Sequence, residues 1–138
     1  MLEYKLVYKI NEDIKKIREE VFIVEQGFKE EFDDIDNIAT FILVFFNNKA
    51  IATSRVYKSE VDEYYIGRVA VLKEYRDLKV GKKMLELLEE EVKKLGGKRL
   101  IVSSQVRAQG FYEKCGFVSF GNTYLDEHVP HILMKKEV

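Results

Sequence analysis

Alternating apolar and polar positions mark the beginning of the chain, and several later segments, as β-strands. Leu2, Tyr4, Leu6 and Tyr8 recur at every second position, which predicts a strand over 2–8. An Asn-Asn pair at 47–48 is a turn signal between two β-rich runs, so these runs are expected to form a hairpin. Strands are predicted at 40–46, 50–57, 64–72, 99–103, 117–120 and 132–135.

Three other stretches have the signals of helices. Asn11 is a suitable N-cap for a helix over 12–25, and Gly27 is a natural stop. The apolar stripe of this helix consists of Ile14, Ile17, Val21 and Val24. A second helix, over 80–95, has a stripe of Val80, Met84, Leu85, Leu88, Val92 and Leu95. A short helix is predicted over 108–115, with Gly116 at its end.

The order of these elements predicts a mixed α/β (α+β) fold with a strand–helix–strand crossover over 64–103. A chain of 138 residues suits one domain, so 1–138 is expected to be a single unit. The first strand–helix unit has no glycine-rich turn, which argues against a Rossmann-type nucleotide-binding domain.

Composition excludes several classes of protein. Hydrophobic residues make up 46% of the chain, which is enough for a core. The formal net charge is −1, and the lack of a basic excess argues against a nucleic-acid partner. The longest apolar run, at 41–46, is too short to span a bilayer, so no membrane partner is expected. There is no signal-peptide pattern, and the cytoplasm is the expected location. One cysteine and two histidines are too few for a metal site, so none is expected.

The start of the 80–95 helix breaks a local electrostatic preference. Helix N-termini favour acidic residues because their free N–H groups make that end positive. Here Arg76, Lys79, Lys82 and Lys83 gather, opposed only by Asp77. The conflict is worth roughly 0.3–1 kcal/mol per charge and a bound polyanion would resolve it. The alternative interpretation is an ordinary solvated basic surface. The segment is not a Walker loop, because no Ser or Thr follows the first lysine.

Five motifs in order give the sequence a resemblance to a known family. They are REEVFIVEQ at 18–26, IGRVAV at 66–71 before RDLKVG at 76–81, Gln105, AQGFYEKCGF at 108–117, and LDEHVPH at 125–131. This combination resembles the GCN5-related N-acetyltransferase (GNAT) superfamily, and within it the ElaA-like branch. The resemblance covers nearly the whole chain, about 2–136. It implies a mixed, mostly antiparallel sheet of about six or seven strands flanked by about four helices.

The resemblance also implies acetyl-CoA as cosubstrate and no metal. In the family, the loop before the long helix holds the pyrophosphate, and the preceding strand pairs its backbone with the pantetheine arm. The implied acetyl-CoA contacts in this chain are Val69, Ala70, Val71, Arg76, Asp77, Leu78, Lys79, Val80, Gly81, Lys82, Gln105, Phe111 and Tyr112. The other implied partner is an unidentified amine. The sequence leaves the oligomeric state open, with a homodimer as the expectation.

Two positions depart from the family pattern. Lys79 replaces the first glycine of the pyrophosphate loop. We expect it to be tolerated if its dihedrals are helical and only its N–H faces the phosphate. A histidine expected in this branch after the acidic run is Phe41 here.

The implied reaction is direct transfer of the acetyl group to a primary amine in a ternary complex. Tyr112 is the candidate general acid for the thiolate, and a backbone N–H over 69–71 is the candidate oxyanion donor. The candidate base or acceptor contact is Glu25 or His131, with direct proton uptake by water as a third option. A covalent route through Cys115 is disfavoured, because no histidine is adjacent in sequence.

An acidic run and a rival function complete the picture. Glu30, Glu31, Asp33, Asp34 and Asp36 form either a solvated loop or a surface that attracts a cationic amine. The rival to the enzyme is an acyl-CoA-binding sensor or interaction module without transferase activity. Lys79 and Phe41 keep the module as an alternative, whereas the complete Phe-Tyr-Glu segment at 111–113 favours the enzyme.

Overall fold

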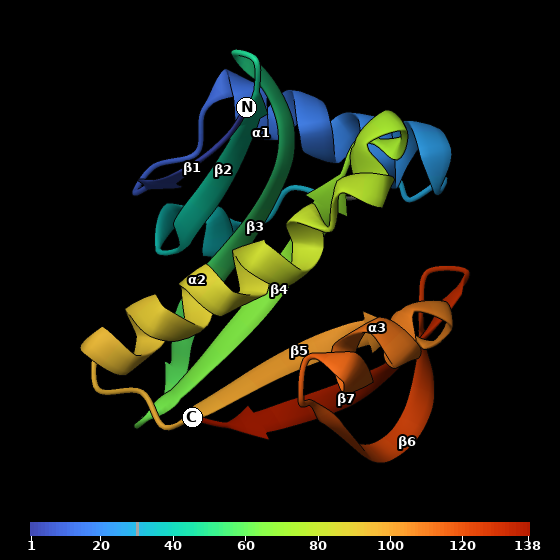
Figure 1. The fold of residues 1–138 in the computed structure, drawn as a ribbon. Helices are drawn as coiled ribbons and strands as arrows, with labels where there is room; N and C mark the ends of the chain where they lie inside the picture. Colours follow the sequence, from blue (N-terminus) through green and yellow to red (C-terminus); the bar gives the residue numbers. More distant parts are fainter. Residues whose placement is uncertain (30) are drawn as a thin grey trace.

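A seven-stranded sheet organises the chain in the computed structural model, which describes residues 1–29 and 31–138 (Figure 1). The strand order is β1-β2-β3-β4-β5-β7-β6. The β4–β5 pair is parallel and the other neighbouring pairs of the described strands are antiparallel. The strands are β1 (Leu2–Val7), β2 (Thr40–Phe46), β3 (Lys49–Glu60), β4 (Glu63–Val71), β5 (Arg99–Gln105), β6 (Val118–Asp126) and β7 (Val129–Glu137).

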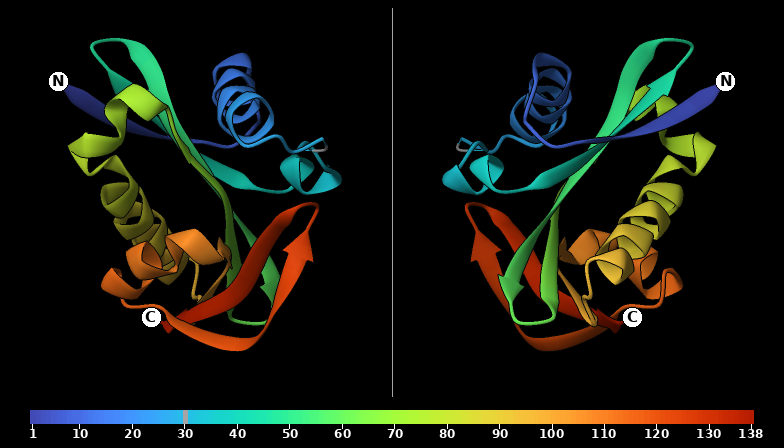
Figure 2. Two further views of the ribbon diagram at one scale, coloured as in Figure 1. Left: turned by 90° about the vertical axis from the view of Figure 1, so that its right-hand side faces the viewer. Right: turned by 90° about the vertical axis from the view of Figure 1, so that its left-hand side faces the viewer.

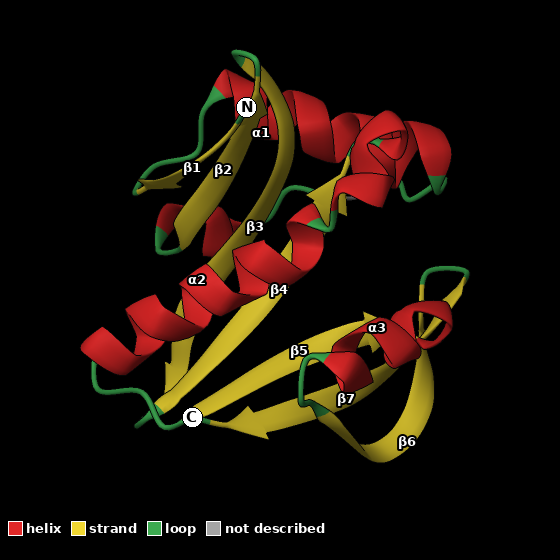
Figure 3. Ribbon diagram, viewed as in Figure 1, coloured by secondary structure: helices red, strands yellow, loops and turns green. Residues whose placement is uncertain are grey.

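Helices cover both faces of this sheet. Figure 2 shows α1 and α2 on opposite sides of it, and Figure 3 shows the same layers by element type. The helices are α1 (Glu12–Arg18), the π-helix η1 (Glu19–Glu25), α2 (Val80–Lys94), α3 (Gln109–Lys114) and the 3₁₀ segments η2 (Asp34–Asn37), η3 (Lys73–Leu78) and η4 (Val106–Ala108). The predicted mixed α/β architecture is confirmed. Within the described part of the chain, no helix is both long enough and apolar enough to cross a membrane.

Strand β2 shows why two helical layers are needed. Phe41 and Leu43 belong to the hydrophobic cluster under α1, whereas Ile42 and Val44 belong to the cluster under α2. Successive side chains of a strand point to opposite faces, so an unbroken apolar run must be covered on both. Phe41, at the position where a histidine was expected, is fully buried in this core. It is not among the residues that line the cavity described below.

The helix predicted over 12–25 changes its winding halfway. Its first half is α1, with Asn11 accepting a hydrogen bond from the N–H of Ile14 at 2.9 Å as the expected N-cap. Its second half is the π-helix η1, and the N–H of Gln26 donates to the carbonyl of Val21 five residues earlier. The wider turn shifts the side-chain phase. Val24, predicted for the buried stripe, is therefore 66% exposed.

The parallel pair β4–β5 separates partway along its length. Pairing runs from Glu63↔Arg99 to Ile66↔Val102, yet β4 continues to Val71 and β5 to Gln105. On its other side β4 stays paired with β3, but its register shifts where Arg68 adopts a positive φ of 51°. This irregularity is a β-bulge, which bends the strand. The two strands thus open a wedge between the two halves of the sheet.

The last two strands are longer than predicted. The sequence suggested 117–120 and 132–135, whereas β6 and β7 form a long hairpin over 118–126 and 129–137. The missed part of β6 is polar and contains Gly121, and its register shifts between Phe120 and Tyr124. An edge strand needs neither regular alternation nor two buried faces, so the sequence pattern does not extend the predicted strand over this part.

Candidate active site

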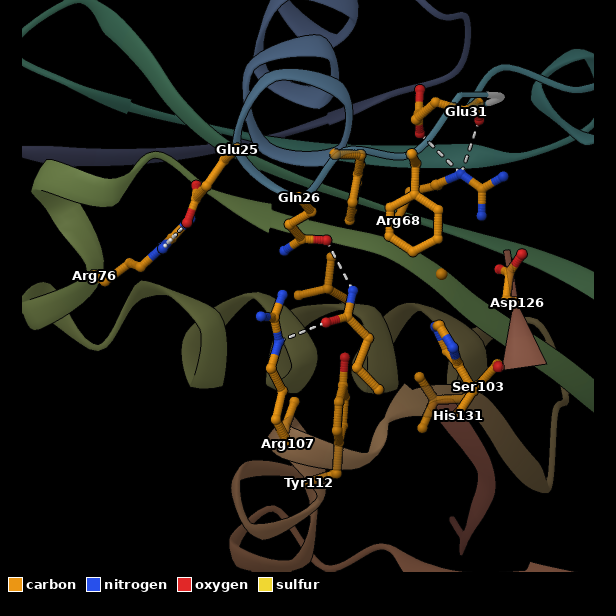
Figure 4. Close-up of a pocket in the computed structure, with 17 residues that line it drawn as sticks. Glu25, Gln26, Glu31, Arg68, Arg76, Ser103, Arg107, Tyr112, Asp126 and His131 are labelled. Atoms are coloured by element: carbon orange, nitrogen blue, oxygen red, sulfur yellow. Dashed lines mark hydrogen bonds and ion pairs between the residues drawn. The ribbon is translucent and has the colours of Figure 1, made fainter. Parts of the chain in front are cut away.

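A cavity of about 330 Å³ lies in the wedge between β4 and β5 (Figure 4). Its walls come from the end of η1, the bulge of β4, the end of β5, helix α3 and the β6–β7 hairpin. Lining residues that the sequence singled out are Glu25, Val69, Arg76, Gln105, Tyr112 and His131. Lining residues that it did not single out as site residues include Phe22, Gln26, Phe28, Arg68, Ser103, Arg107 and Asp126.

The start of α2 provides an anion-binding surface next to this cavity. None of the described side chains caps the helix, its first turn holds no acid, and Lys79 stands at the N-cap position. Gly81 lets the start of the helix pack closely against Phe111, because a Cβ there would lie 3.1 Å from that ring. Free N–H groups with nearby lysines and no competing carboxylate are suited to a phosphate, so these residues fit the pyrophosphate of a coenzyme A.

The expected dihedrals of Lys79 require a correction. The residue is left-handed, with φ 57° and ψ 30°, not right-handed helical. Position 79 keeps the left-handed conformation that glycine adopts easily, but the residue is a lysine. The left-handed region costs an L-residue with a side chain roughly 1–2 kcal/mol.

Lys79→Gly is expected to stabilise the folded protein by about 0.5–1 kcal/mol, since relief of the left-handed strain exceeds glycine's entropic cost. Urea unfolding followed by circular dichroism would measure the change. Lys83→Gly, within the same helix, is the matched control and is expected to destabilise the protein by about 1 kcal/mol. A loss of stability in Lys79→Gly would contradict the argument.

Arg76 and Glu25 form a two-pronged ion pair across one end of the cavity. The Arg76 guanidinium donates to both Glu25 oxygens at 2.6 and 2.7 Å, and its Nε donates to the carbonyl of Val71 at 3.0 Å. The hydrogen bond from Arg76 lowers the pKa of Glu25. Glu25 therefore holds its proton less readily than an ordinary carboxylate, which is unfavourable for a base working near neutral pH.

The other predicted coenzyme contacts are distributed around this loop. Asp77 and Leu78 lie in η3 and are not among the cavity-lining residues. Ala70 and Val80 are buried in the two core clusters, so only their backbones are available to a ligand. Lys82 lines a separate small hollow beside Cys115. Cys115 is thus outside the main cavity, and burial raises the pKa of its thiol, which agrees with a structural role.

Tyr112 stands on α3 with its side chain in the cavity (Figure 4). Its ring is held edge-on between Phe111 and Phe117, with centroids 5.0 and 5.8 Å away. The residue is only 7% exposed, and burial raises the pKa of the phenol. None of the described residues hydrogen-bonds its hydroxyl. The phenol is therefore protonated at neutral pH and has its donor free.

A chain of amide contacts crosses the cavity near Tyr112. Gln105 at the end of β5 donates from Nε2 to the side-chain oxygen of Gln26 at 2.8 Å, and Arg107 Nε donates to Gln105 Oε1 at 2.8 Å. The chain links the end of η1 to the end of β5, as Figure 4 shows. Gln105 is in the cavity as predicted, where it contacts the opposite wall.

His131 lies in a row of side chains across three strands. It pairs with Gln105 of β5 on one side and with Tyr124 of β6 on the other. Its ring stacks on Tyr124 and meets Phe28 edge-on. Its Nδ1 lies 2.9 Å from the carbonyl oxygen of Val129, which can only accept, so Nδ1 carries the proton. In the neutral ring, Nε2 then holds the lone pair, and none of the described residues engages it.

The acidic run is not a solvated loop. Its members pair with arginines from α1, β3 and β4: Arg18 with Glu31 and Asp36, Arg55 with Asp33 and Asp36, and Arg68 with Glu31 and Asp33. Glu31 and Asp36 are buried, and Asp34 is exposed. Glu30 lies outside the described residues. We call these six side chains the arginine–carboxylate network.

The network also bears on the other interpretation of the acidic run, a surface that attracts a cationic amine. Its three guanidinium groups balance three carboxylates, so Glu31, Asp33 and Asp36 together add little net charge with which to attract an amine. Burial raises the pKa of Glu31 against the opposing effect of Arg18. One Glu31 oxygen and the Arg55 Nε are buried without a partner among the described residues.

Comparisons with known proteins agree with this architecture. The family model described as "Acetyltransferase (GNAT) domain" matches residues 10–138. Protein ElaA of Escherichia coli is 32% identical over 129 residues, covering 89% of this chain and 84% of ElaA. YyaT of Bacillus subtilis is 34% identical over 128 residues, covering 89% of this chain and 86% of YyaT.

Solved structures give the same result. The crystal structure of Escherichia coli ElaA superposes with a TM-score of 0.89 at 27% identity, covering 99% of this chain and 100% of ElaA. An acyl-CoA N-acyltransferase from Pseudomonas aeruginosa shares the fold, with a TM-score of 0.88 at 23% identity and 99% coverage of both chains. The resemblance predicted from the motifs is confirmed, and the chain belongs to the GNAT acetyltransferase family.

Proposed function

We propose that the protein transfers the acetyl group of acetyl-CoA to a primary amine by direct attack in a ternary complex. Membership of the GNAT family carries acyl transfer from an acyl-CoA. The observation that supports the finer proposal is the cavity in the β4–β5 wedge, where the Tyr112 phenol and the His131 imidazole line one space beside the basic start of α2.

The donor side of the proposed site is the end nearest α2 and η3. The uncapped N–H groups of α2, with Lys79 and Lys82, would hold the pyrophosphate. Pairing of β4 with β5 ends at Ile66 in the described residues, and the β4 edge beyond it would pair with the pantetheine arm. Acetyl-CoA supplies the activated thioester, and the remaining chemistry falls to side chains and backbone.

His131 is the proposed base. Its Nε2 accepts a proton from the attacking amine, while its Nδ1–H stays bonded to the Val129 carbonyl, which stabilises the charged ring. As the new C–N bond forms, a backbone N–H over 69–71 stabilises the negative charge on the thioester oxygen. The C–S bond then breaks, and Tyr112 donates its hydroxyl proton to the departing sulfur. Both Glu25 oxygens accept hydrogen bonds from Arg76, so Glu25 is assigned the role of positioning Arg76 and not the role of the base.

The direct test is release of free CoA from acetyl-CoA with a panel of primary amines, together with mass spectrometry of the acetylated product. Turnover with at least one amine is expected. A parallel thermal-shift measurement with CoA separates the rival function. Thermal stabilisation by CoA without turnover of any amine on a broad panel would contradict the proposed transferase activity. It would instead support an acyl-CoA-binding module.

His131→Gln is expected to lower kcat/KM by roughly 10- to 100-fold, because water would replace an oriented base. Steady-state CoA release at a series of acceptor concentrations would measure the loss.

Glu25→Gln is the matched comparison. It should keep kcat near the wild-type value and change the KM for acetyl-CoA, because it frees Arg76. If Glu25→Gln loses kcat and His131→Gln keeps it, the assignment of the base is reversed.

A further inference from the structure

We propose that the acceptor is a linear amine carrying a second cationic group, and that Asp126 holds this group about 7 Å from the nitrogen that is acetylated. The proposal rests on the proposed function, because it names the substrate class of the same cavity. Three observations support it: the charge balance of the cavity, the position of Asp126, and the spacing along β6.

The charged groups that line the cavity are nearly all paired with one another. Glu25 is paired with Arg76, and Glu31 with Arg68 at 2.9 Å. Two charges remain. Arg107 contacts only the neutral amide of Gln105, and Asp126 has no hydrogen bond or ion pair to any described residue. The cavity therefore offers one unpaired cation and one unpaired anion to its ligands.

These two charges lie at different ends. The positive charge of Arg107 contributes to lowering the pKa of Glu25. Arg107 therefore belongs to the donor end of the cavity, together with Arg76. Figure 4 shows Asp126 on the other side of the cavity, with Ser103 and His131. An anionic donor and a cationic acceptor would each find its complement.

The spacing comes from the strand register. Tyr124 pairs with His131, and Asp126 is two residues further along β6 toward the turn, where it pairs with Val129. Asp126 is therefore a diagonal neighbour of His131 on the same face of the strand pair, and diagonal neighbours are about 7 Å apart. At roughly 1.2 Å per bond of extended chain, this distance corresponds to about six bonds. Cadaverine, a five-carbon diamine, has that separation between its nitrogens.

Aromatic side chains of the cavity wall suit a methylene chain. Phe22 and Phe28 line the cavity, and the Phe28 ring meets His131 edge-on at 6.4 Å. Aromatic rings attract an ammonium group while also packing against CH₂ groups. Arg68 faces the cavity as well, but Glu31 and Asp33 already compensate its charge.

The test compares three acceptors of matched length: cadaverine, pentylamine, which lacks the second charge, and δ-aminovalerate, which has a carboxylate instead. For the wild-type protein we expect kcat/KM in the order cadaverine, pentylamine, δ-aminovalerate. Asp126→Asn should lower kcat/KM for cadaverine about fivefold and leave pentylamine within about twofold, as for a partly solvated ion pair. Asp34→Asn, another exposed aspartate that lies outside the cavity, is the control and should change neither.

Salt provides an independent readout. The preference for cadaverine over pentylamine should shrink as ionic strength rises, because a charge pair at the cavity mouth is screened. Equal use of pentylamine and cadaverine by the wild type, or an equal loss of both amines in Asp126→Asn, would overturn the proposal while leaving the acetyltransferase intact.

Failure of the proposed function has a different signature. If no amine releases CoA, cadaverine binding by calorimetry in the presence of CoA still tests Asp126. Weaker binding in Asp126→Asn than in the wild type and Asp34→Asn would support the cationic subsite without catalysis. Unchanged or absent cadaverine binding would overturn it.

Discussion

Arg18→Met is expected to destabilise the folded protein by about 3–5 kcal/mol, the usual range for removing one partner from a buried charge cluster. The Arg18 side chain is 0% exposed and donates to Glu31 at 2.8 Å and to Asp36 at 2.8 and 3.0 Å. Methionine fills much of the same space but leaves two buried carboxylates with fewer compensating charges. Urea unfolding monitored by circular dichroism would measure the loss.

Lys16→Met is the matched control, because Lys16 lies on the same helix but is exposed. It should change the free energy of unfolding by less than about 0.5 kcal/mol. Wild-type stability in Arg18→Met would show that the arginine–carboxylate network is not what holds the acidic run to the sheet.

The same network gives stability a dependence on pH. Burial would raise the pKa of Asp36, but Arg18 and Arg55 outweigh it and lower the value, and a hydrogen bond from Arg55 lowers the pKa of Asp33. Carboxylates with lowered pKa values stabilise the fold above the ordinary carboxyl pKa, and this contribution is lost as pH falls. Glu31, with a raised pKa, contributes in the opposite direction. In Arg18→Met the acid-induced loss due to Asp36 should be smaller than in the wild type.

Tyr112→Phe is expected to lower turnover by roughly 10²- to 10⁴-fold, the range for losing a positioned general acid. The substitution removes one oxygen and no hydrogen bond to a described residue, and both ring contacts remain. Stability and CoA affinity should therefore be unchanged, so the loss would lie in kcat. Steady-state CoA release, with CoA affinity from calorimetry, would measure the two quantities separately.

Tyr4→Phe provides the control, because Tyr4 packs against the core from β1 and is not among the cavity-lining residues. It should keep wild-type turnover. If Tyr112→Phe turns over normally at every pH, the acid role belongs to another group or to water.

Regular elements were predictable where one physical signal dominated. The run at 40–46 matches β2 because six consecutive apolar residues must lie in a sheet covered on both faces. The 80–95 stripe matches α2 because its residues recur at helical spacing. Tyr112, Gln105 and His131 were placed in the cavity through the family resemblance and not through periodicity.

Other features depend on distant partners and gave no local signal. Glu31 and Asp36 are buried because Arg18, Arg55 and Arg68 come to them from separate elements. The positions of Asp126 and Arg107 in the cavity depend on the register of the last hairpin and on the end of β5, which the local sequence does not specify. The π-winding of η1 likewise depends on packing that a three-to-four-residue period does not encode.

The wedge in the sheet divides the molecule mechanically into two lobes. A ladder of four residue pairs, ending at Ile66 and Val102, joins them along the strands. At the open end, Gln26 reaches across from one lobe to Gln105 of the other. The Lys29 N–H and the Gln26 carbonyl also contact Glu127 and His128 of the last hairpin, and Phe28 packs against His128 and His131. Because these contacts come from side chains and not from strand pairing, we expect a bulkier substrate to widen the wedge at this end, while the four strand pairs keep the other end closed.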